Sequence, residues 1–161
     1  GSQRVNQLIA EAIPHLTSVC QIIHLSGKDR PQEQAERAAQ LFPFYHVFQF
    51  FHDEMSDAYA VADLIIARGG FGTLTEIAAL GKAAIILPKG GHQEENVDWL
   101  AKQGGLVQAD ERGLTGYALA QHIKQLLIHK SDRLRLGQQL QKLLPIANND
   151  MIMAITKRLA A

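Results

Sequence analysis

The amino-acid sequence predicts an α/β fold built on a Rossmann-like, doubly wound parallel sheet. Short apolar runs of strand length alternate along the chain with longer segments whose apolar residues recur at helical spacing. That alternation is typical of parallel sheets, in which helices form the crossovers between strands. In addition, two polar or glycine-rich loops directly follow predicted strands, which is where such sheets bind ligands.

Composition limits the chain to one domain without a general affinity for polyanions. The 161 residues are 47% hydrophobic and 20% charged, which suits a single globular domain over residues 1–161. The 16 basic and 16 acidic side chains cancel. We therefore expect no nucleic-acid partner, and any phosphate recognition must be local.

The single cysteine and the hydropathy pattern indicate a cytoplasmic protein. Cys20 has no second cysteine to pair with, and it lies in an apolar run at residues 19–23, so we expect a buried, unreactive thiol. No apolar stretch approaches the roughly 18 residues of a membrane span, and no signal peptide opens the sequence.

The expected elements follow in order along the chain. Strands are predicted at residues 18–25, 45–51, 63–67, 83–87 and 106–108. Helices are predicted at residues 5–16, 31–41, from 53 onward, 73–80, after a polar loop at 88–94, and as three segments to the C-terminus. We expect one parallel sheet of five strands, with helices on both faces and the two loops meeting at one end.

One strand of the usual pattern is absent, because the chain starts on a helix. The first strand of a doubly wound sheet usually lies in its middle, and the turn after it often binds phosphate. Gly1-Ser2 is either the remnant of that turn or an addition from cloning, and we expect the second. An empty position between strands 18–25 and 63–67 would leave backbone groups buried and unpaired, and each such group costs about 1 to 3 kcal/mol. We therefore predict that the position is filled. The filling segment comes from residues outside this sequence or from a partner chain, or else the two strands close onto each other.

The first candidate site is the turn between a strand and a helix at residues 67–76. It contains three glycines, Gly69, Gly70 and Gly72, which allow backbone conformations that other residues rarely adopt. Amide groups at the helix start can bind anions such as a diphosphate. Thr73 either caps the helix or bonds a phosphate oxygen, and Glu76 is placed to accept hydrogen bonds from two ribose hydroxyls. The alternative is an ordinary turn, with Glu76 placed to suit the helix dipole.

The second candidate site is the loop at residues 88–96. It also follows a strand, so it should open on the same edge of the sheet and converge with the first turn. It offers the donors and acceptors that a hydroxyl-rich sugar requires, namely His92, Gln93, Glu94 and Asn96. The alternative is a solvated loop in which His92 and Asn96 cap the next helix. The chain lacks clustered His and Cys, so we expect neither a metal nor a cofactor.

These motifs resemble glycosyltransferase family 28, specifically the C-terminal domain of the bacterial undecaprenyldiphospho-muramoylpentapeptide N-acetylglucosaminyltransferases. The most specific segments are residues 62–70, 75–82 and 92–96. Weaker agreement covers residues 4–7, 26–28, 51–55 and 145 to the end.

The resemblance implies one Rossmann-like half of a GT-B glycosyltransferase, which binds UDP-GlcNAc in a cleft facing the other half. It implies the following contacts: uracil at the backbone of Phe51 and His52, ribose at Glu76, diphosphate and sugar at Phe71, Gly72 and Thr73, and GlcNAc at Gln93 and Glu94 with Asn96 nearby. Arg68 and Gly70 complete the implied set, Arg68 as the organiser of the turn. The enzyme would transfer GlcNAc to a lipid-linked muramoyl-pentapeptide at the cytoplasmic face of the inner membrane.

The chain departs from the family pattern in two places. The family's glycine-serine phosphate loop is represented only by Gly1-Ser2-Gln3, so Ser2 does not inherit the diphosphate. The acceptor site, the membrane-contacting surface and the base that inverting transfer needs belong to the family's N-terminal domain, and no catalytic residue is assigned here. Three alternatives stay open: a donor-binding subunit that needs a partner chain, a nonenzymatic UDP-sugar-binding module, and a purely structural fragment whose cleft stays empty.

Overall fold

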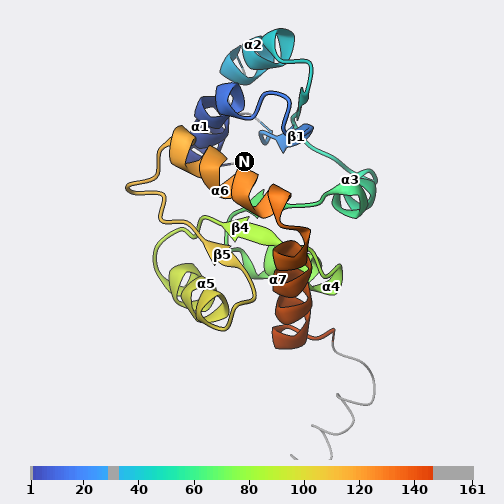
Figure 1. Cartoon of the computed structure of the whole chain (residues 1–161), viewed down its shortest axis with the longest axis vertical. Coiled ribbons are helices and arrows are strands. Elements are labelled where there is room, and N and C mark those ends of the chain that lie inside the picture. The colour runs from blue at the N-terminus through green and yellow to red at the C-terminus, as the bar shows by residue number, and fades with distance from the viewer. Residues whose placement is uncertain (1, 29–32, 147–161) are drawn as a thin grey trace, which may run out of the picture.

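The computed structural model describes residues 2–28 and 33–146 (Figure 1). From the N-terminus, its elements are α1 (Gln3–Ala12), a 3-10 turn (Ile13–His15), β1 (Ile22–Leu25), α2 (Glu33–Leu41), β2 (Tyr45–Phe48), α3 (Met55–Val61), β3 (Ile65–Ala67), α4 (Phe71–Ala79), β4 (Ala84–Ile86), α5 (His92–Lys102), β5 (Val107–Gln108), α6 (Gly116–Ile128) and α7 (Lys130–Leu143). Helices and strands alternate as the sequence predicts, and the fold is the expected doubly wound α/β class.

Among the described residues the five strands form two sheets, so the expected single five-stranded sheet is wrong for this structure. β1 pairs with β2, β3 pairs with β4, and β4 pairs with β5, and every pair is parallel. β1 and β3 are not hydrogen-bonded to each other, so the described residues do not close the position of the absent first strand. Of the three ways of filling it, direct closure of the neighbouring strands is therefore wrong for this structure.

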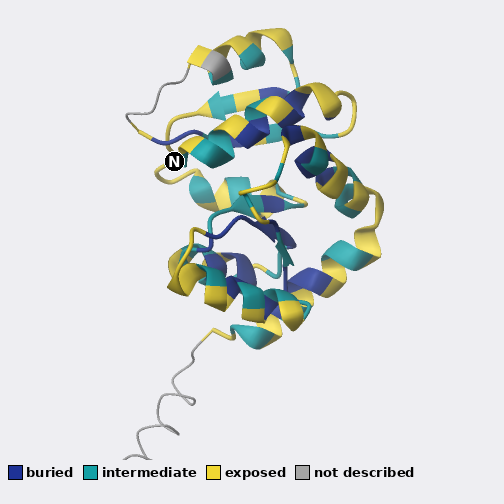
Figure 2. Cartoon of the chain, turned by 90° about the vertical axis from the view of Figure 1, so that its left-hand side faces the viewer, coloured by how far each residue is buried: buried dark blue, intermediate teal, exposed yellow. Residues whose placement is uncertain are grey.

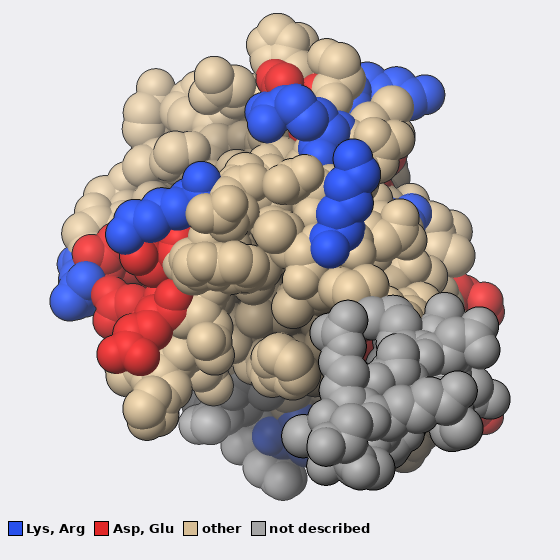
Figure 3. All heavy atoms as spheres, turned by 90° about the horizontal axis from the view of Figure 1, so that it is seen from below, with Lys and Arg blue, Asp and Glu red and all other residues tan. Residues whose placement is uncertain are grey.

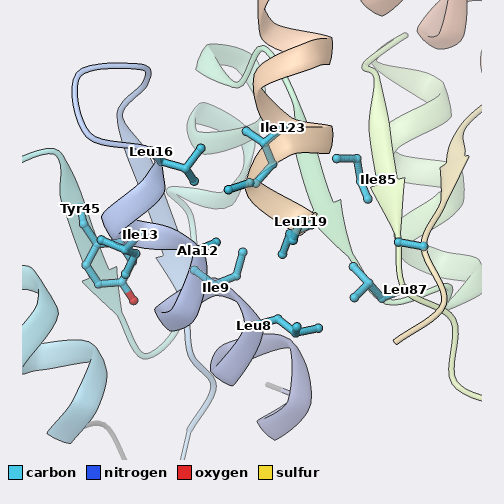
Figure 4. Close-up of a cluster of buried hydrophobic side chains, with 12 residues drawn as sticks. Leu8, Ile9, Ala12, Ile13, Leu16, Tyr45, Ile85, Leu87, Leu119 and Ile123 are labelled. Carbon is cyan, nitrogen blue, oxygen red and sulfur yellow. The ribbon is translucent and has the colours of Figure 1, made fainter. Parts of the chain in front are cut away.

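Two apolar layers cover the two faces of the three-stranded sheet. On one face, Ile85 and Leu87 pack with buried residues of α1 and α6 such as Leu8 and Leu119 (Figure 4). On the other face, Ile86 packs with residues of α4, α5 and α7. The alternation follows from the strand period of two, which sends successive side chains to opposite faces. Figure 2 accordingly shows the buried residues along the strands and on the inward sides of the helices.

A buried polar chain ties α1 to β1 and β2. Asn6 Oδ1 lies 3.1 Å from His24 Nε2, and His24 Nδ1 lies 2.5 Å from the Tyr45 hydroxyl. Because Asn6 Oδ1 only accepts, Nε2 holds the proton and Nδ1 accepts from Tyr45. Burial lowers the pKa of His24 to about 4 and raises the pKa of Tyr45 to about 12, so both side chains are neutral in the folded protein at pH 7.

Several boundaries differ from the sequence-based expectations. β1 begins at Ile22 instead of residue 18, since Ser18 has a φ of 62°, which belongs to a turn and not to a strand. α4 begins at Phe71, two residues earlier than expected. Cys20 precedes the strand and is half-buried, and burial raises the pKa of its thiol, so the thiolate form is disfavoured. The third C-terminal helix expected from the sequence falls outside the described residues beyond Ile146.

In the part of the chain that the structure describes, none of the helices combines the length and the apolar character needed to cross a membrane.

Candidate functional site

The predicted site residues all lie just past the carboxyl ends of strands. Phe51 and His52 follow β2, Arg68 and Gly70 follow β3, and the loop that ends at His92 follows β4. All strand pairs are parallel, so these carboxyl ends within each sheet point to one edge. Crevices at this edge are where open α/β sheets bind ligands.

The turn after β3 is in direct contact with the start of α5. A Cβ placed on Gly69 would lie 2.5 Å from Val97 Cγ2 and 3.6 Å from the Gln93 carbonyl oxygen. Gly69 is therefore required to be a glycine because α5 occupies the space of its side chain. This close approach brings the segment at residues 68–73 beside the segment at residues 91–96, which is the convergence that the sequence predicts.

Arg68 binds protein atoms with most of its donors. Its Nε and Nη2 donate to Ser2 Oγ at 3.0 and 2.6 Å, and its Nη1 donates to the Leu87 carbonyl at 3.1 Å. The same Nη1 lies 2.6 Å from Glu111 Oε2 in a half-buried ion pair. Arg68 thus joins the first turn of α1, the end of β4 and the segment after β5, so its side chain organises the edge of the sheet and is not free for a ligand.

The start of α4 presents amide groups without a side-chain cap. Gly70 is the N-cap residue and has no side chain to accept a hydrogen bond, and the first turn contains no acidic residue. A Cβ placed on Gly70 or Gly72 would meet nothing within 4 Å, so the space beside this backbone is open. Thr73 lies within the helix and does not cap it, which corrects one of the two roles considered for it. These features suit close approach of an anionic group.

Glu76 lies in the second turn of α4, on the side facing α3. The Tyr59 hydroxyl donates to Glu76 Oε2 at 3.1 Å. Burial raises the pKa of Tyr59 to about 12, with a further contribution from the Glu76 carboxylate, so Tyr59 remains a donor at neutral pH. Glu76 is otherwise exposed, which leaves acceptor positions of its carboxylate open to a ligand.

The N-cap residue of α5, like that of α4, is a glycine. Gly91, the N-cap residue, has a φ of 87°, a conformation that side chains rarely adopt, and it provides no side-chain cap. His92 and Asn96 are helical and do not cap α5, so the alternative role considered for them is wrong. His92, Gln93 and Asn96 are exposed, whereas Glu94 is half-buried and accepts from Arg112 Nη2 at 3.1 Å.

The segment after β2 forms an aromatic cluster at the carboxyl end of the two-stranded sheet. The ring centroids of Phe48 and Phe51 are 4.9 Å apart, as are those of Phe50 and His52. Lys28 Nζ lies 4.7 Å from the centre of the Phe50 ring. The His52 amide donates to Glu54 Oε2 at 3.1 Å, so that donor is already bonded within the loop.

The candidate site is an open surface. A shallow groove of about 280 Å³ borders it at Gly91 and Glu94, and its other lining residues belong to α5 and β5. On the face shown in Figure 3, basic and acidic side chains lie beside each other within a larger uncharged surface. Among the described residues, no three His, Cys, Asp or Glu side chains gather as metal ligands would.

The side chains that hold the predicted site residues in place were not evident from the sequence. Ser2 and Glu111 hold Arg68, Tyr59 holds Glu76, and Arg112 holds Glu94. These partners lie 17 to 66 positions away from the residues that they contact, so no local spacing indicates them.

Comparisons with known proteins agree with this architecture. Residues 1–147 match the model of the glycosyltransferase family 28 C-terminal domain. The chain is 37% identical over 147 residues to the UDP-N-acetylglucosamine–N-acetylmuramyl-(pentapeptide) pyrophosphoryl-undecaprenol N-acetylglucosamine transferase of Anaeromyxobacter sp. (strain Fw109-5), a match that covers 86% of this chain and 38% of the relative. It is 37% identical over 139 residues to the transferase of the same description from Syntrophus aciditrophicus (strain SB), covering 81% of this chain and 38% of the relative.

A solved structure extends the match over the whole chain. Acinetobacter baumannii MurG superposes with a TM-score of 0.79 at 25% identity, and the match covers 100% of this chain and 47% of that protein. A glycosyltransferase of kitacinnamycin, at 18% identity and a TM-score of 0.74, shows the same fold. The chain thus spans well under half the length of the curated relatives that it matches. It belongs to glycosyltransferase family 28, as a C-terminal domain of that family.

Proposed function

We propose that this chain is the donor-binding half of an inverting glycosyltransferase, which holds UDP-GlcNAc for transfer to a lipid-linked muramoyl-pentapeptide. The single observation that carries the proposal is the pair of uncapped helix starts, α4 at Gly70 and α5 at Gly91, which the Gly69 contact brings side by side. Two helix N-termini at one edge of a parallel sheet suit a diphosphate. The curated relatives are named for a UDP-N-acetylglucosamine donor.

Each part of the donor has a matching surface in this arrangement. The diphosphate lies against the amides of residues 71–73, where the first turn contains no acidic side chain to repel it. The ribose hydroxyls donate to the carboxylate of Glu76, which Tyr59 orients. The exposed side chains at the start of α5, Gln93 and Asn96 with Glu94 beside them, bind the sugar hydroxyls.

The uracil ring belongs near Phe51 and His52, in the aromatic segment after β2. Aromatic side chains provide stacking surfaces for bases, and the backbone of this segment offers polar groups for the edge of the ring. This segment and the two helix starts lie beyond the ends of β2, β3 and β4, so a nucleotide sugar laid along the edge reaches all three.

Transfer itself requires more than this half. Inversion needs a base that deprotonates the acceptor hydroxyl while the diphosphate leaves from the opposite face of the sugar. We assign that base, the lipid-acceptor site and the contact with the cytoplasmic face of the inner membrane to the remainder of a longer protein. In isolation, this chain is expected to bind donor without transferring it.

Substitution of Glu76 tests the proposal. Glu76→Gln keeps the size of the side chain and removes the charge, so UDP binding should weaken by about 1.5 to 3 kcal/mol, the range for hydrogen bonds to charged groups. Titration calorimetry with UDP-GlcNAc and UDP measures the change. Glu95→Gln is the matched control, because Glu95 is an exposed carboxylate in α5 that the proposal does not use.

The outcomes also separate this function from the alternatives. If the wild type and the folded Glu76→Gln protein bind UDP with equal affinity, Glu76 only interacts favourably with the dipole of α4 and does not contact the nucleotide. If the wild type does not bind UDP or UDP-GlcNAc, the donor-binding proposal is overturned. Activity recovered only with a separate partner chain would identify a donor-binding subunit. Binding without activity in the whole protein would identify a nonenzymatic module.

A further inference from the structure

The segment after β5 contacts two parts of the candidate site through consecutive residues. Glu111 Oε2 lies 2.6 Å from Nη1 of Arg68, which organises the turn after β3. The next residue, Arg112, donates from Nη2 to Glu94 Oε1 at 3.1 Å, in the first turn of α5. The helix start that we propose for the sugar therefore has a charged partner from outside α5.

This segment is itself held in place on both sides. The Ala109 amide donates to the Ile86 carbonyl at 2.9 Å, directly after the last residue pair of β4 and β5. Arg4 of α1 donates to the carbonyl oxygens of Glu111 and Leu114, at 3.2 and 2.8 Å. The segment therefore presents its side chains from backbone that is bonded to both the sheet and α1.

Asp110 fixes the guanidinium of Arg112. Nε of Arg112 donates to Asp110 Oδ1 at 2.9 Å, and the Arg112 amide donates to the same oxygen at 3.0 Å. The side-chain hydrogen bond is the main cause that lowers the pKa of the Asp110 carboxyl and raises the pKa of Arg112, so both groups are charged at neutral pH. A planar guanidinium that is bonded at Nε directs its other donors along fixed lines. Nη2 therefore meets Glu94 from one direction.

Arg112 binds one oxygen of the Glu94 carboxylate and leaves the other available. Within the described residues only Oε1 has a donor, whereas Oε2 lies near the loop before α5, 3.8 Å from a Cβ placed on Gly90. Glu94 also lines the groove of about 280 Å³ beside α5 and β5. Pockets for whole small molecules measure about 300 to 1,000 Å³, so this groove has room for one sugar and not for a nucleotide sugar.

We propose that Arg112 is a positioning residue for the donor sugar, which holds Glu94 so that Oε2 accepts a hydrogen bond from a sugar hydroxyl in the groove. The inference rests on the proposed function, which places the sugar at the start of α5. A glutamate side chain loses rotamer freedom when it is immobilised, and the bond to Arg112 imposes that loss before the sugar arrives. Arg112 therefore determines how much the sugar adds to the binding of the nucleotide.

The competing explanation is an exposed ion pair that serves only the fold. The Arg112 side chain is 73% exposed, and exposed ion pairs contribute little to stability. Loss of Arg112 should therefore leave the free energy of unfolding nearly unchanged in urea unfolding. A selective loss of sugar affinity in such a variant would come from the site and not from a weakened fold.

Titration calorimetry of the wild-type chain and its variants with UDP-GlcNAc and with UDP tests the proposal. Glu94→Gln should weaken UDP-GlcNAc binding at least about tenfold, the lower end for a hydrogen bond to a charged group, and leave UDP binding unchanged. Arg112→Gln should weaken UDP-GlcNAc binding about 2- to 10-fold, the effect of ordering one long side chain, again without a change for UDP. In the double variant it should add nothing to Glu94→Gln, because Arg112 acts through Glu94.

Two further variants separate positioning from charge and from general effects. Arg112→Lys keeps the charge but lacks the planar fork that reaches Asp110 and Glu94 together, so it should bind UDP-GlcNAc as weakly as Arg112→Gln does. Lys102→Gln breaks another exposed ion pair of α5, in which Nζ lies 2.6 Å from Asp98 Oδ2, and should change neither affinity.

The outcomes separate failure of this inference from failure of the proposed function. Full UDP-GlcNAc affinity in Arg112→Lys would overturn the positioning role, because charge alone would then suffice. An equal loss for both ligands in Arg112→Gln would overturn it too, as would no loss for either ligand while Glu94→Gln weakens UDP-GlcNAc. If Glu94→Gln changes neither affinity, the sugar contact and the role of Arg112 both fail, while nucleotide binding by the wild type stands. Absence of binding by the wild type would overturn the proposed function as well.

Discussion

The two sheets of this domain are buried to very different degrees. In β4, the central strand of the three-stranded sheet, Ala84, Ile85 and Ile86 are all 0% exposed. In the two-stranded sheet, Ile23 is 46% exposed and Phe48 is 43% exposed. The three-stranded sheet is covered on both faces, whereas β1 and β2 are covered well on only one.

This difference corresponds to a difference in how the two sheets support the candidate site. The starts of α4 and α5 lie at the end of the three-stranded sheet, held by the Gly69 contact and by Arg68. The aromatic segment lies at the end of the two-stranded sheet, which is linked to α1 by the polar chain through His24 and by apolar packing against Tyr45. We infer that the proposed diphosphate and sugar surfaces are rigid and that the proposed nucleobase surface depends on the less buried sheet.

The largest expected effect comes from matched truncations in the two sheets. Ile86→Ala removes a fully buried side chain and should lower the free energy of unfolding by about 2 to 5 kcal/mol. Ile23→Ala makes the same chemical change on a half-exposed residue and should cost under about 1 kcal/mol. Urea unfolding of both variants measures the difference. Equal losses would show that the two sheets are equally well packed.

Acid should weaken the two-stranded sheet through His24. The pKa of His24 is about 4 in the folded protein and near 6.5 when unfolded, so its contribution to stability is complete above pH 6.5 and is lost as the pH falls toward 4. Between pH 6.5 and pH 5 the loss should be about 2 kcal/mol. His24→Gln should remove this part of the pH dependence.

His46→Gln serves as its control, since His46 lies exposed in the neighbouring strand β2. It should keep the pH dependence of the wild type. An identical dependence of unfolding on pH in His24→Gln and wild type would show that His24 does not stay neutral in the folded protein.

A smaller effect is expected from a methyl group at the start of α4. Gly72→Ala meets nothing in the protein and favours the helix, so stability should rise by up to about 1 kcal/mol. UDP affinity should fall roughly tenfold, because the methyl group occupies space that the diphosphate approaches. Gly113→Ala, another glycine with open space around it, should leave the affinity unchanged. If Gly72→Ala binds UDP as the wild type does, the diphosphate lies elsewhere.

The smallest effect should come from Tyr59, which joins α3 to α4. Tyr59→Phe removes the hydrogen bond that orients Glu76, so UDP binding should weaken by about 0.5 to 1.5 kcal/mol. Tyr117→Phe, at an exposed tyrosine of α6, is the control and should have no effect. A loss as large as that of Glu76→Gln would indicate that Tyr59 itself contacts the nucleotide.

The sequence predicted the order of elements and the edge at which the candidate residues lie, because the apolar period and the loop positions are local properties. It misplaced the start of α4, since Gly72 has a poor helix propensity but lies in the first turn, where Gly70 provides the N-cap. It also could not indicate that Ser2 and Glu111 bind Arg68, because those contacts arise only when three distant segments meet. Closure of β1 onto β3 was one of three expected ways of filling the position between them, and only the structure shows that these two strands do not pair.

The most direct test of the central claim is titration of the chain with UDP-GlcNAc, followed through its backbone amide shifts by NMR. The account predicts saturable shifts at residues 51–52, 69–76 and 91–96, with the largest at the start of α4. Residues of α7, which pack against the opposite end of α4 and Gly81, should not respond. Saturable binding whose shifts centre on α7 or on the opposite edge of the sheet, or no shift at millimolar nucleotide sugar, would contradict the account.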